Sequence, residues 1–201
     1  QRTVADQPNR VWRADHKGHF RTGDGRLGEP LTVTDGYSRY LVVLWPSSGT
    51  GEREARKAFM AAFLRYGLPD VILTDNGNPF VSTTQTGLTR LAVWWIKLGI
   101  RHERIPPGRW DHNASHERFH ATLCEATLSP PAPSCRAQRR RFMRFQTLYN
   151  EVRPHEALAQ VPPAQRYAPS TRKLPALLAP PVYADDMLVR RVRTNGTIKW
   201  Q

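Results

Sequence analysis

The chain has 201 residues, and 30 Lys and Arg against 17 Asp and Glu give it a formal net charge of +13. Hydrophobic residues make up 39% of it, enough for one sizeable core plus an appendage. No apolar stretch approaches the roughly 20 residues of a membrane helix, and the polar start has no secretory h-region. We therefore expect a cytoplasmic protein with no membrane partner, and the positive charge favours a polyanion such as nucleic acid.

The two cysteines, Cys124 and Cys135, lack the paired spacing of a zinc site or a disulfide framework, so we expect reduced, structural thiols. His112, His116 and His120 recur at four-residue steps, which places them on one face of a helix. Without cysteine partners, DNA contact or plain surface exposure is favoured over zinc binding for these histidines.

β-rich runs at 11–20, 31–35 and 40–45 are separated by Gly and Asp turn signals and predict three consecutive antiparallel strands. A helix is predicted over 52–66, because apolar residues recur at helical spacing until Gly67 ends the pattern. One face of this helix is expected to lie on the sheet.

A short buried strand at 71–74 and a helix around 88–98 come next, and the order strand, helix, strand implies a parallel crossover. A further strand is predicted at 100–105, followed by a helix that carries Glu117. An amphipathic helix is predicted over 137–151. Its apolar side comprises Phe142, Phe145, Leu148 and Tyr149.

Seven prolines between 154 and 181 exclude long helices and predict a Pro-rich strap or linker. Residues 182–201 contain two strand-like runs joined through Asn195-Gly196, which predicts a C-terminal β-hairpin or the start of a truncated small β-barrel. We therefore divide the chain into a core at 1–153, a strap at 154–181 and a hairpin at 182–201.

Three acidic residues are the strongest functional signal: Asp15 lies in a strand-like run, Asp75 follows the end of another, and Glu117 lies on a helix. Two carboxylates about 4 Å apart repel by roughly 4 kcal/mol at an effective dielectric constant near 20, so convergence requires a cation. Taken singly, Asp15 fits a hydrogen-bonding strand residue, Asp75 a turn former and Glu117 a partner of the helix dipole. Their joint context favours a metal site of hard oxygen ligands for Mg²⁺ or Mn²⁺.

A cluster of arginines marks the helix at 137–151 and its approach. A phosphate-facing surface and a solvated helix face explain this cluster equally well. The cluster comprises Arg136, Arg139, Arg140, Arg141 and Arg144.

Five segments in order resemble the catalytic core of the retroviral-integrase-like DDE transposases of bacterial insertion sequences. The resemblance implies an α/β, ribonuclease-H-like fold with a five-stranded mixed sheet flanked by helices, and the predicted element order agrees. It also implies a polynucleotidyl transferase in which Asp15, Asp75 and Glu117 are the catalytic residues and hold two Mg²⁺ or Mn²⁺ ions. The segments are 11–20, 34–40, 73–77, 113–120 and 150–158.

By the same resemblance, water cuts a strand at the element's end and the freed 3′-hydroxyl attacks target DNA. The expected partners are element-end and target DNA and further copies of the chain, as a dimer or higher multimer, in the bacterial nucleoid. Turn and cap roles remain equal alternatives for Asn76 and Asn113. The assigned DNA-binding residues are Asn76, Arg109, Asn113, His116, Arg118, His120 and the arginine cluster.

Two departures from the family pattern leave other functions open. Relatives commonly carry basic residues four and seven positions after the glutamate, where this chain has Ala121 and Cys124. Loss of two phosphate contacts lowers the salt dependence of DNA binding by roughly 1–2 units of slope. The alternatives are a non-catalytic DNA-binding or assembly module and a ribonuclease-H-type nuclease. Asp35 is interpreted as a turn residue, and His155 as a tether of the strap.

Overall fold

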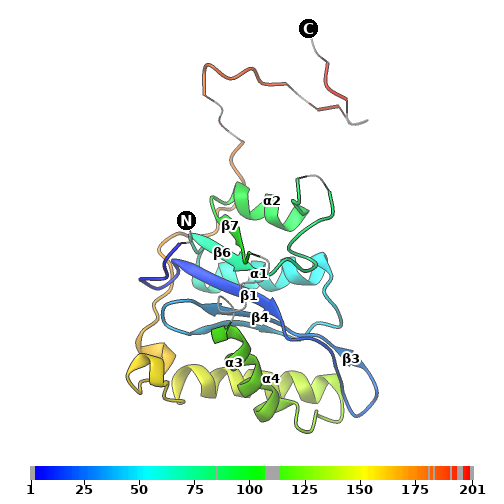
Figure 1. Cartoon of the computed structure of the whole chain (residues 1–201), viewed down its shortest axis with the longest axis vertical. Helices are drawn as coiled ribbons and strands as arrows, with labels where there is room; N and C mark the ends of the chain where they lie inside the picture. The colour runs from blue at the N-terminus through cyan, green and yellow to red at the C-terminus, as the bar shows by residue number, and fades with distance from the viewer. Residues whose placement is uncertain are drawn as a thin grey trace.

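The computed structural model describes residues 3–84, 86–106 and 114–180, and beyond them 182, 184–190, 192, 193 and 197–199; of 114 and 115 it describes the backbone only. These residues form an α/β fold with a five-stranded mixed sheet and four α-helices (Figure 1). The predicted α/β class and the five-stranded mixed sheet are confirmed. No helix within the described ranges is long and apolar enough to cross a membrane.

The sheet has the order β5-β4-β1-β6-β7, with β1 (Val11–His16) at its centre. On one side β1 pairs antiparallel with β4 (Leu31–Asp35), which pairs antiparallel with β5 (Leu41–Trp45). On the other side it pairs parallel with β6 (Val71–Thr74), and β6 pairs parallel with β7 (Arg101–Arg104). The three antiparallel strands and the parallel crossover confirm the predicted order.

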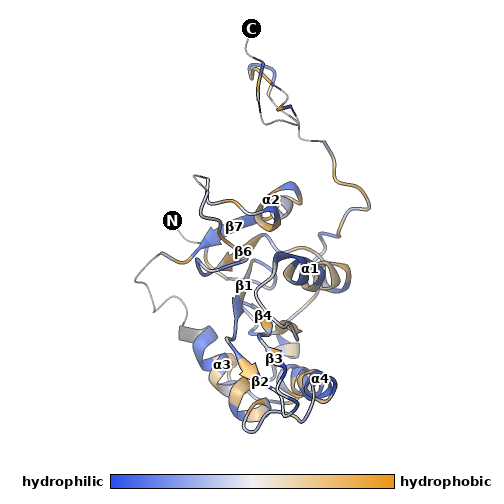
Figure 2. Cartoon of the chain, turned by 90° about the vertical axis from the view of Figure 1, so that its right-hand side faces the viewer, coloured by the Kyte–Doolittle hydropathy of each residue, from blue (hydrophilic) through white to orange (hydrophobic). Residues whose placement is uncertain are grey.

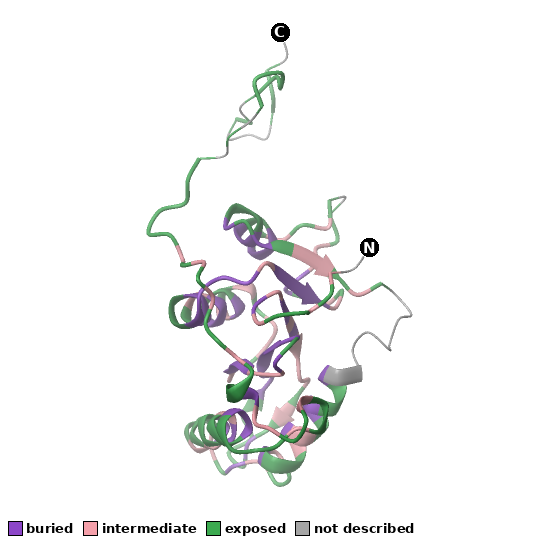
Figure 3. Ribbon diagram, turned by 90° about the vertical axis from the view of Figure 1, so that its left-hand side faces the viewer, coloured by how far each residue is buried: buried purple, intermediate pink, exposed green. Residues whose placement is uncertain are grey.

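Neighbouring strands β6 and β7 differ sharply in polarity. β6 is hydrophobic and buried along its length, whereas β7 is hydrophilic and partly exposed (Figures 2 and 3). β7 lies at the edge of the sheet, where charged side chains discourage pairing with another chain. Arg101 and Glu103 of β7 form an ion pair of 3.2 Å on this edge.

One face of the sheet is covered by α1 (Glu52–Tyr66) and α2 (Arg90–Lys97). α1 has the predicted bounds, and Gly67 ends it with a φ of 78°, a left-handed conformation that favours glycine. Aromatic side chains form the core between these helices and the strands. Trp12 of β1 packs on Phe63, and Phe59 packs edge-on against Trp95 with ring centroids 4.8 Å apart.

The opposite face is covered by α3 (Ala114–Thr127) and α4 (Cys135–Glu151), which pack on apolar residues of β5. α4 begins two residues earlier than predicted, because the Ser134 hydroxyl caps it by accepting a hydrogen bond from the backbone N–H of Ala137. Phe142, Phe145 and Tyr149 are buried as predicted. The prediction for Leu148 was wrong: it lies beside the buried stripe and is 48% exposed.

The predicted first strand is shorter than its β-rich run. β1 ends at His16, and Gly18 turns the chain with a φ of 88°. Phe20 then begins a separate two-stranded ribbon of β2 (Phe20–Arg21) and β3 (Leu27–Gly28). The correction arises because a glycine with positive φ interrupts the run.

Residues beyond α4 return to the core through two short 3₁₀ helices, Glu156–Leu158 and Pro163–Gln165. Tyr167 stacks on Tyr40 with ring centroids 4.1 Å apart. Arg172 donates hydrogen bonds to the carbonyl oxygens of Pro69, Leu98 and Gly99. These contacts fix part of the proline-rich segment, and its role as a linker stays a prediction.

The C-terminal hairpin also stays a prediction. Val192 and Ile198 form an isolated antiparallel bridge, as a hairpin requires. Its predicted turn, Asn195-Gly196, lies outside the described residues.

Candidate active site

Asp15 and Asp75 come to the same edge of the sheet. β1 and β6 run parallel in a register that pairs Ala14 with Thr74, and the two aspartates are the next residues along each chain. Side chains at paired positions of parallel strands leave the sheet on the same face. Two carboxylates from segments 60 residues apart in the sequence therefore lie at neighbouring carboxyl ends of central strands.

The Asp75 carboxylate presents one buried oxygen that no described residue hydrogen-bonds. Its Oδ1 atom is buried and has no hydrogen-bond partner among the described residues. Gly77 makes room for the other oxygen, because a Cβ at that position would lie 2.8 Å from Asp75 Oδ2. Leaving a buried carboxylate oxygen unpaired costs at least about 1–3 kcal/mol, a cost that a cation removes. The site therefore fits a hard divalent ion such as Mg²⁺.

A hydrogen-bond hub centred on Thr32 connects Asp15 to α3. The Thr32 hydroxyl lies 3.0 Å from the carbonyl oxygen of Asp15 and 2.8 Å from the Nε2 atoms of both His116 and His120. A hydroxyl has one proton, which it donates to the carbonyl, so both imidazoles donate from Nε2. His116 Nδ1 is then free to accept from the Thr34 hydroxyl, 3.4 Å away.

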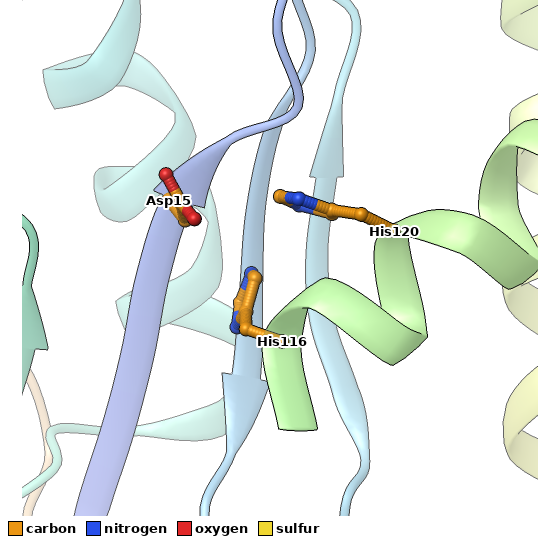
Figure 4. Close-up of side chains that lie close together, drawn as sticks. All are labelled: Asp15, His116 and His120. Atoms are coloured by element: carbon orange, nitrogen blue, oxygen red, sulfur yellow. The ribbon is translucent and has the colours of Figure 1, made fainter. Parts of the chain in front are cut away.

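Both histidines point from α3 towards Asp15 (Figure 4). One ligand atom from each of Asp15, His116 and His120 lies within 4.8 Å of the others, close enough for a shared metal ion. The hub gives these imidazoles a role without a metal, because both Nε2 atoms donate to Thr32. Asp75 and Glu117 are not members of this group.

Burial keeps the two imidazoles neutral. It lowers the pKa of His116 well below its ordinary value, and the nearby His120 and Arg13 lower it further. Burial, with smaller contributions from Lys17 and His16, lowers the pKa of His120 to about 3. Near neutral pH these histidines therefore add no positive charge to offset the aspartates.

Glu117 follows His116 directly at the start of α3, so its Cα atom lies about 3.8 Å from that of His116. Successive helical residues point about 100° apart, which follows from 3.6 residues per turn. Glu117 is accordingly exposed while His116 is only 1% exposed. The helix thus carries the third predicted carboxylate beside the edge that holds Asp15.

The structure changes the interpretation of the two α3 histidines. Sequence reasoning assigned His116 and His120 to DNA contact, but their side chains are 1% and 9% exposed and are hydrogen-bonded to Thr32. Buried side chains present no surface to a phosphate, so we withdraw that assignment. Arg118, by contrast, is exposed on the same helix.

The other predicted DNA-binding residues lie in different surroundings. Asn76 is exposed and donates from Nδ2 to the carbonyl of Ile105, 2.8 Å away, which connects the ends of β6 and β7. Arg141 donates to the carbonyls of Thr127 and Pro130 and so supports the connection between α3 and α4. The exposed members of the arginine cluster are Arg136, Arg139, Arg140 and Arg144. Arg109 and Asn113 lie outside the described residues.

Two structural interpretations made from the sequence agree with the observed contacts. Asp35 is fully buried, and its carboxylate accepts hydrogen bonds from the backbone of Asn9 and from the backbone and hydroxyl of Ser38. His155 packs edge-on against Tyr149 and forms a backbone bridge with Val161.

Sequence reasoning missed Thr32, His16 and Gly77. His16 is near enough for Asp75 to raise its pKa, although burial is the larger effect and lowers it. Neither ring nitrogen of His16 has a hydrogen-bond partner among the described residues. The position of His16 directly after Asp15 was the available signal.

The fold and the site together define a class of protein: an α/β domain with acidic residues at the carboxyl ends of its central parallel strands. The chain belongs to the integrase core domain family. An integrase core domain model matches residues 5–109, just over half of the chain, and a second model of that description matches residues 98–163.

Relatives come from bacterial insertion elements. The chain is 30% identical to the insertion element IS476 uncharacterized 39.2 kDa protein of Xanthomonas euvesicatoria, over 81% of this chain and 45% of the relative. It is 29% identical to the insertion element IS407 uncharacterized 31.7 kDa protein of Burkholderia multivorans, over 82% of this chain and 57% of the relative. The chain thus spans about half the length of these relatives.

Solved structures share the fold at low sequence identity. The HTLV-2 integrase catalytic core domain in complex with magnesium aligns with a TM-score of 0.56 and 16% identity, covering 81% of this chain and 98% of that one. A chain of the simian T-cell lymphotropic virus intasome in complex with PP2A regulatory subunit B56 gamma aligns with a TM-score of 0.64 and 20% identity, covering 96% and 68%.

Proposed function

We propose that this chain is the catalytic core of an insertion-element transposase, which cleaves DNA strands and joins them to target DNA with divalent metal ions. The observation that carries the proposal is the pairing of Asp15 and Asp75 at neighbouring strand ends, with Asp75 Oδ1 buried and lacking a donor, in an integrase core domain. The insertion-element relatives and the fold shared with a magnesium-bound integrase core support it.

Asp15, Asp75 and Glu117 are the residues that we propose hold Mg²⁺ or Mn²⁺, as two ions. Such ions supply activation of the attacking oxygen and stabilisation of the leaving oxygen of a phosphodiester. The donor set fits, because all three side chains offer hard carboxylate oxygens and the buried histidines are neutral. Unneutralised carboxylates about 4 Å apart repel by roughly 4 kcal/mol at an effective dielectric constant near 20.

The protein's own contribution is to fix these carboxylates before the ions bind. The Thr32 hydroxyl holds the Asp15 backbone and, through two imidazoles, the first turns of α3. Because Glu117 is on those turns, we propose that the hub positions it relative to Asp15. Arg118, the next residue, is exposed, and we propose that it contacts the DNA backbone.

A plasmid assay tests this function. The wild-type protein, incubated with supercoiled plasmid and Mn²⁺, is expected to produce nicked and joined products, and Asp75→Asn is expected to produce none. Asp6→Asn is the matched control, since Asp6 is an exposed aspartate outside the site. Absence of products with wild type, or equal activity of Asp75→Asn, would refute the proposal.

A second candidate is a DNA-binding or assembly module that has lost chemistry. Ala121 and Cys124 favour it, because family members commonly carry basic residues there, and Glu117 lies outside the Asp15 group. Calorimetric titration with Mn²⁺ separates the two: a catalytic core binds the ion in an Asp75-dependent manner, and a module whose acids do not cooperate does not.

We further propose that the partners are element-end DNA, target DNA and further copies of the chain, within the bacterial nucleoid. A related fold in an intasome and a magnesium-bound core crystallised in dimeric and trimeric forms support assembly. The proposed organisation remains a core at 1–153, a strap at 154–181 and a hairpin at 182–201.

A further inference from the structure

Besides the carboxylate site, the structure has a basic cavity between α3 and the end of α4. It has a volume of about 290 Å³ and is open to solvent through the exposed residues of its rim. Its walls come from the turn before β5, from α3, from the end of α4 and from the segment after α4. The lining residues that matter here are Arg39, Arg118, Thr122, Tyr149, Arg153 and His155.

The three arginines of this cavity are unpaired among the residues that the structure describes. Arg39, Arg118 and Arg153 form no ion pair or side-chain hydrogen bond with the described residues, although each guanidinium carries five donors. Glu156 is the one carboxylate in the lining, so the cavity retains an excess of two positive charges. This excess positive charge favours binding of an anion with several acceptor oxygens, such as a phosphate group.

The three arginines line the same cavity as Tyr149. Burial raises the pKa of Tyr149, and Arg39 and Arg153 both lower it, as expected for guanidiniums in the same cavity. Both also lower the pKa of His155, after burial. His155 Nε2 is a further buried polar atom without a partner among the described residues.

Arg39 is held by a strained turn. Its φ of 62° is left-handed, a conformation that costs a residue with a side chain about 1–2 kcal/mol. Its backbone N–H donates to the carbonyl of Asp35, and the Asp35 carboxylate accepts two hydrogen bonds from Ser38. Asp35 thus fixes the backbone of the turn from which the Arg39 side chain extends, which reduces the ordering cost of binding.

The cavity lies next to the proposed catalytic helix face. Glu117, Ala121 and Cys124 share one face of α3, and Arg118 and Thr122 occupy the adjacent one. The face with Ala121 and Cys124 lacks basic side chains, but the adjacent face carries Arg118. Arg39 and Arg153 line the same cavity as Arg118. A ligand here sits beside Glu117, which favours a DNA phosphate over a free phosphate compound.

We propose that Arg39, Arg118 and Arg153 form a binding site for a phosphate of the DNA backbone, next to Glu117 on α3. This inference rests on the proposed function and deepens it. Each phosphate that a protein neutralises contributes about 0.9 to the slope of log K against log salt for duplex DNA. Because the site binds one phosphate, removal of Arg118 and Arg153 together should lower that slope by about 0.9.

Fluorescence anisotropy with a labelled duplex, in EDTA over a series of NaCl concentrations, tests the site. Arg118→Gln/Arg153→Gln is expected to reduce the slope by about 0.9 units and to weaken binding at least about tenfold at low salt. Arg90→Gln and Arg53→Gln combined are the matched control, because they remove two exposed charges from α2 and α1. A double variant that retains the wild-type slope, or loses no more than the control, overturns the proposal.

A footprint provides a second readout that needs no variant. Phenylglyoxal modifies accessible arginines, and mass spectrometry then reports each one separately. Duplex DNA is expected to protect Arg118 and Arg153 but not Arg90, and inorganic phosphate at the same phosphate concentration is expected to protect none. If DNA leaves Arg118 and Arg153 unprotected, the proposal is wrong, whether or not free phosphate protects them.

These measurements separate the failure of the site from the failure of the proposed function. They contain no divalent ion, so Asp75→Asn should bind the duplex with the wild-type slope. Loss of nicking with intact slopes contradicts the catalytic proposal alone. Intact nicking with unchanged slopes in the double arginine variant contradicts the phosphate site alone.

Discussion

Thr32 lies directly opposite Asp15 across the antiparallel pair of β4 and β1, and its hydroxyl donates to the Asp15 carbonyl oxygen over 3.0 Å. The Thr32 hydroxyl oxygen in turn accepts hydrogen bonds from His116 and His120 of α3. One fully buried hydroxyl therefore connects the central strand, the neighbouring strand and the helix that carries Glu117.

Thr32→Val should destabilise the protein by about 2–6 kcal/mol. Valine has nearly the shape of threonine, but it leaves two buried imidazole N–H groups without an acceptor, at about 1–3 kcal/mol each. Thr34→Val is the control, since its hydroxyl makes one longer contact of 3.4 Å to His116. Urea unfolding at pH 7.5 measures both. If Thr32→Val costs no more than Thr34→Val, the hub contributes little to stability.

Stability should fall as the pH decreases from 6.5, partly because of His120. Burial, the largest cause, lowers its folded-state pKa to about 3. Between pH 6.5 and about 3 the unfolded chain binds the proton and the folded chain does not, so this contribution is present above pH 6.5 and is lost below it.

His120→Gln keeps an N–H donor for Thr32 but cannot titrate. The slope of unfolding free energy against pH between 6 and 4 should therefore decrease by up to about 1.4 kcal/mol per pH unit relative to wild type. Carboxylates and the other histidines titrate in both proteins and cancel in this difference. Urea unfolding at half-unit pH steps gives the slopes, and equal slopes would mean that His120 titrates normally in the folded state.

The sequence predicted best what is locally encoded. The bounds of α1 follow from apolar spacing and from Gly67, and the end of β6 just before Asp75 follows from a short apolar run bounded by polar residues. Each signal lies within about 15 residues of chain, so periodicity and turn chemistry suffice.

The hub could not be predicted, because it depends on the register between distant strands. Nothing near Thr32 in the sequence indicates that two histidines 84 and 88 residues away will donate to it. His116 and His120 at a four-residue step fit an exposed polar face or a buried one equally well. The hydroxyl groups of β4 favour the buried position, because they provide hydrogen-bond partners for the two buried imidazoles.

Asp75→Asn should abolish stabilisation by Mn²⁺ without destabilising the metal-free protein. The metal-free wild type carries a buried carboxylate oxygen with no partner among the described residues, and an amide oxygen is cheaper to bury than a charged one. Thermal unfolding with EDTA and with Mn²⁺ measures both effects, with Asp6→Asn as the control. A metal-dependent rise in Tm that persists in Asp75→Asn would place the ion elsewhere.

Gly77→Ala should impair metal binding while the fold persists. The new Cβ would lie 2.8 Å from Asp75 Oδ2, closer than van der Waals contact allows, so the carboxylate has to move. A Kd for Mn²⁺ at least about tenfold weaker is expected, because a displaced ligand loses its coordination geometry. Gly49→Ala is the control, since a Cβ there meets nothing within 4 Å. Equal Mn²⁺ affinities of the two variants would show that the carboxylate tolerates displacement.

Arg172→Ala should release the segment around Tyr167 from the core. The Arg172 guanidinium donates to three carbonyl oxygens and to Asp70, and its side chain is 36% exposed, so about 1–2 kcal/mol is expected for the set. Tyr167 is partly buried, and chymotrypsin cuts after it only when the segment opens. A loss of 1.4 kcal/mol raises the open population, and hence the cleavage rate, about tenfold.

Two further variants serve as comparisons for Arg172→Ala. Arg172→Lys keeps the charge but not the fork of donors, so an intermediate rate is expected. Lys173→Ala removes one exposed contact and should cleave at nearly the wild-type rate. If Arg172→Ala is cleaved no faster than Lys173→Ala, the stacking of Tyr167 on Tyr40 alone is sufficient to hold this segment.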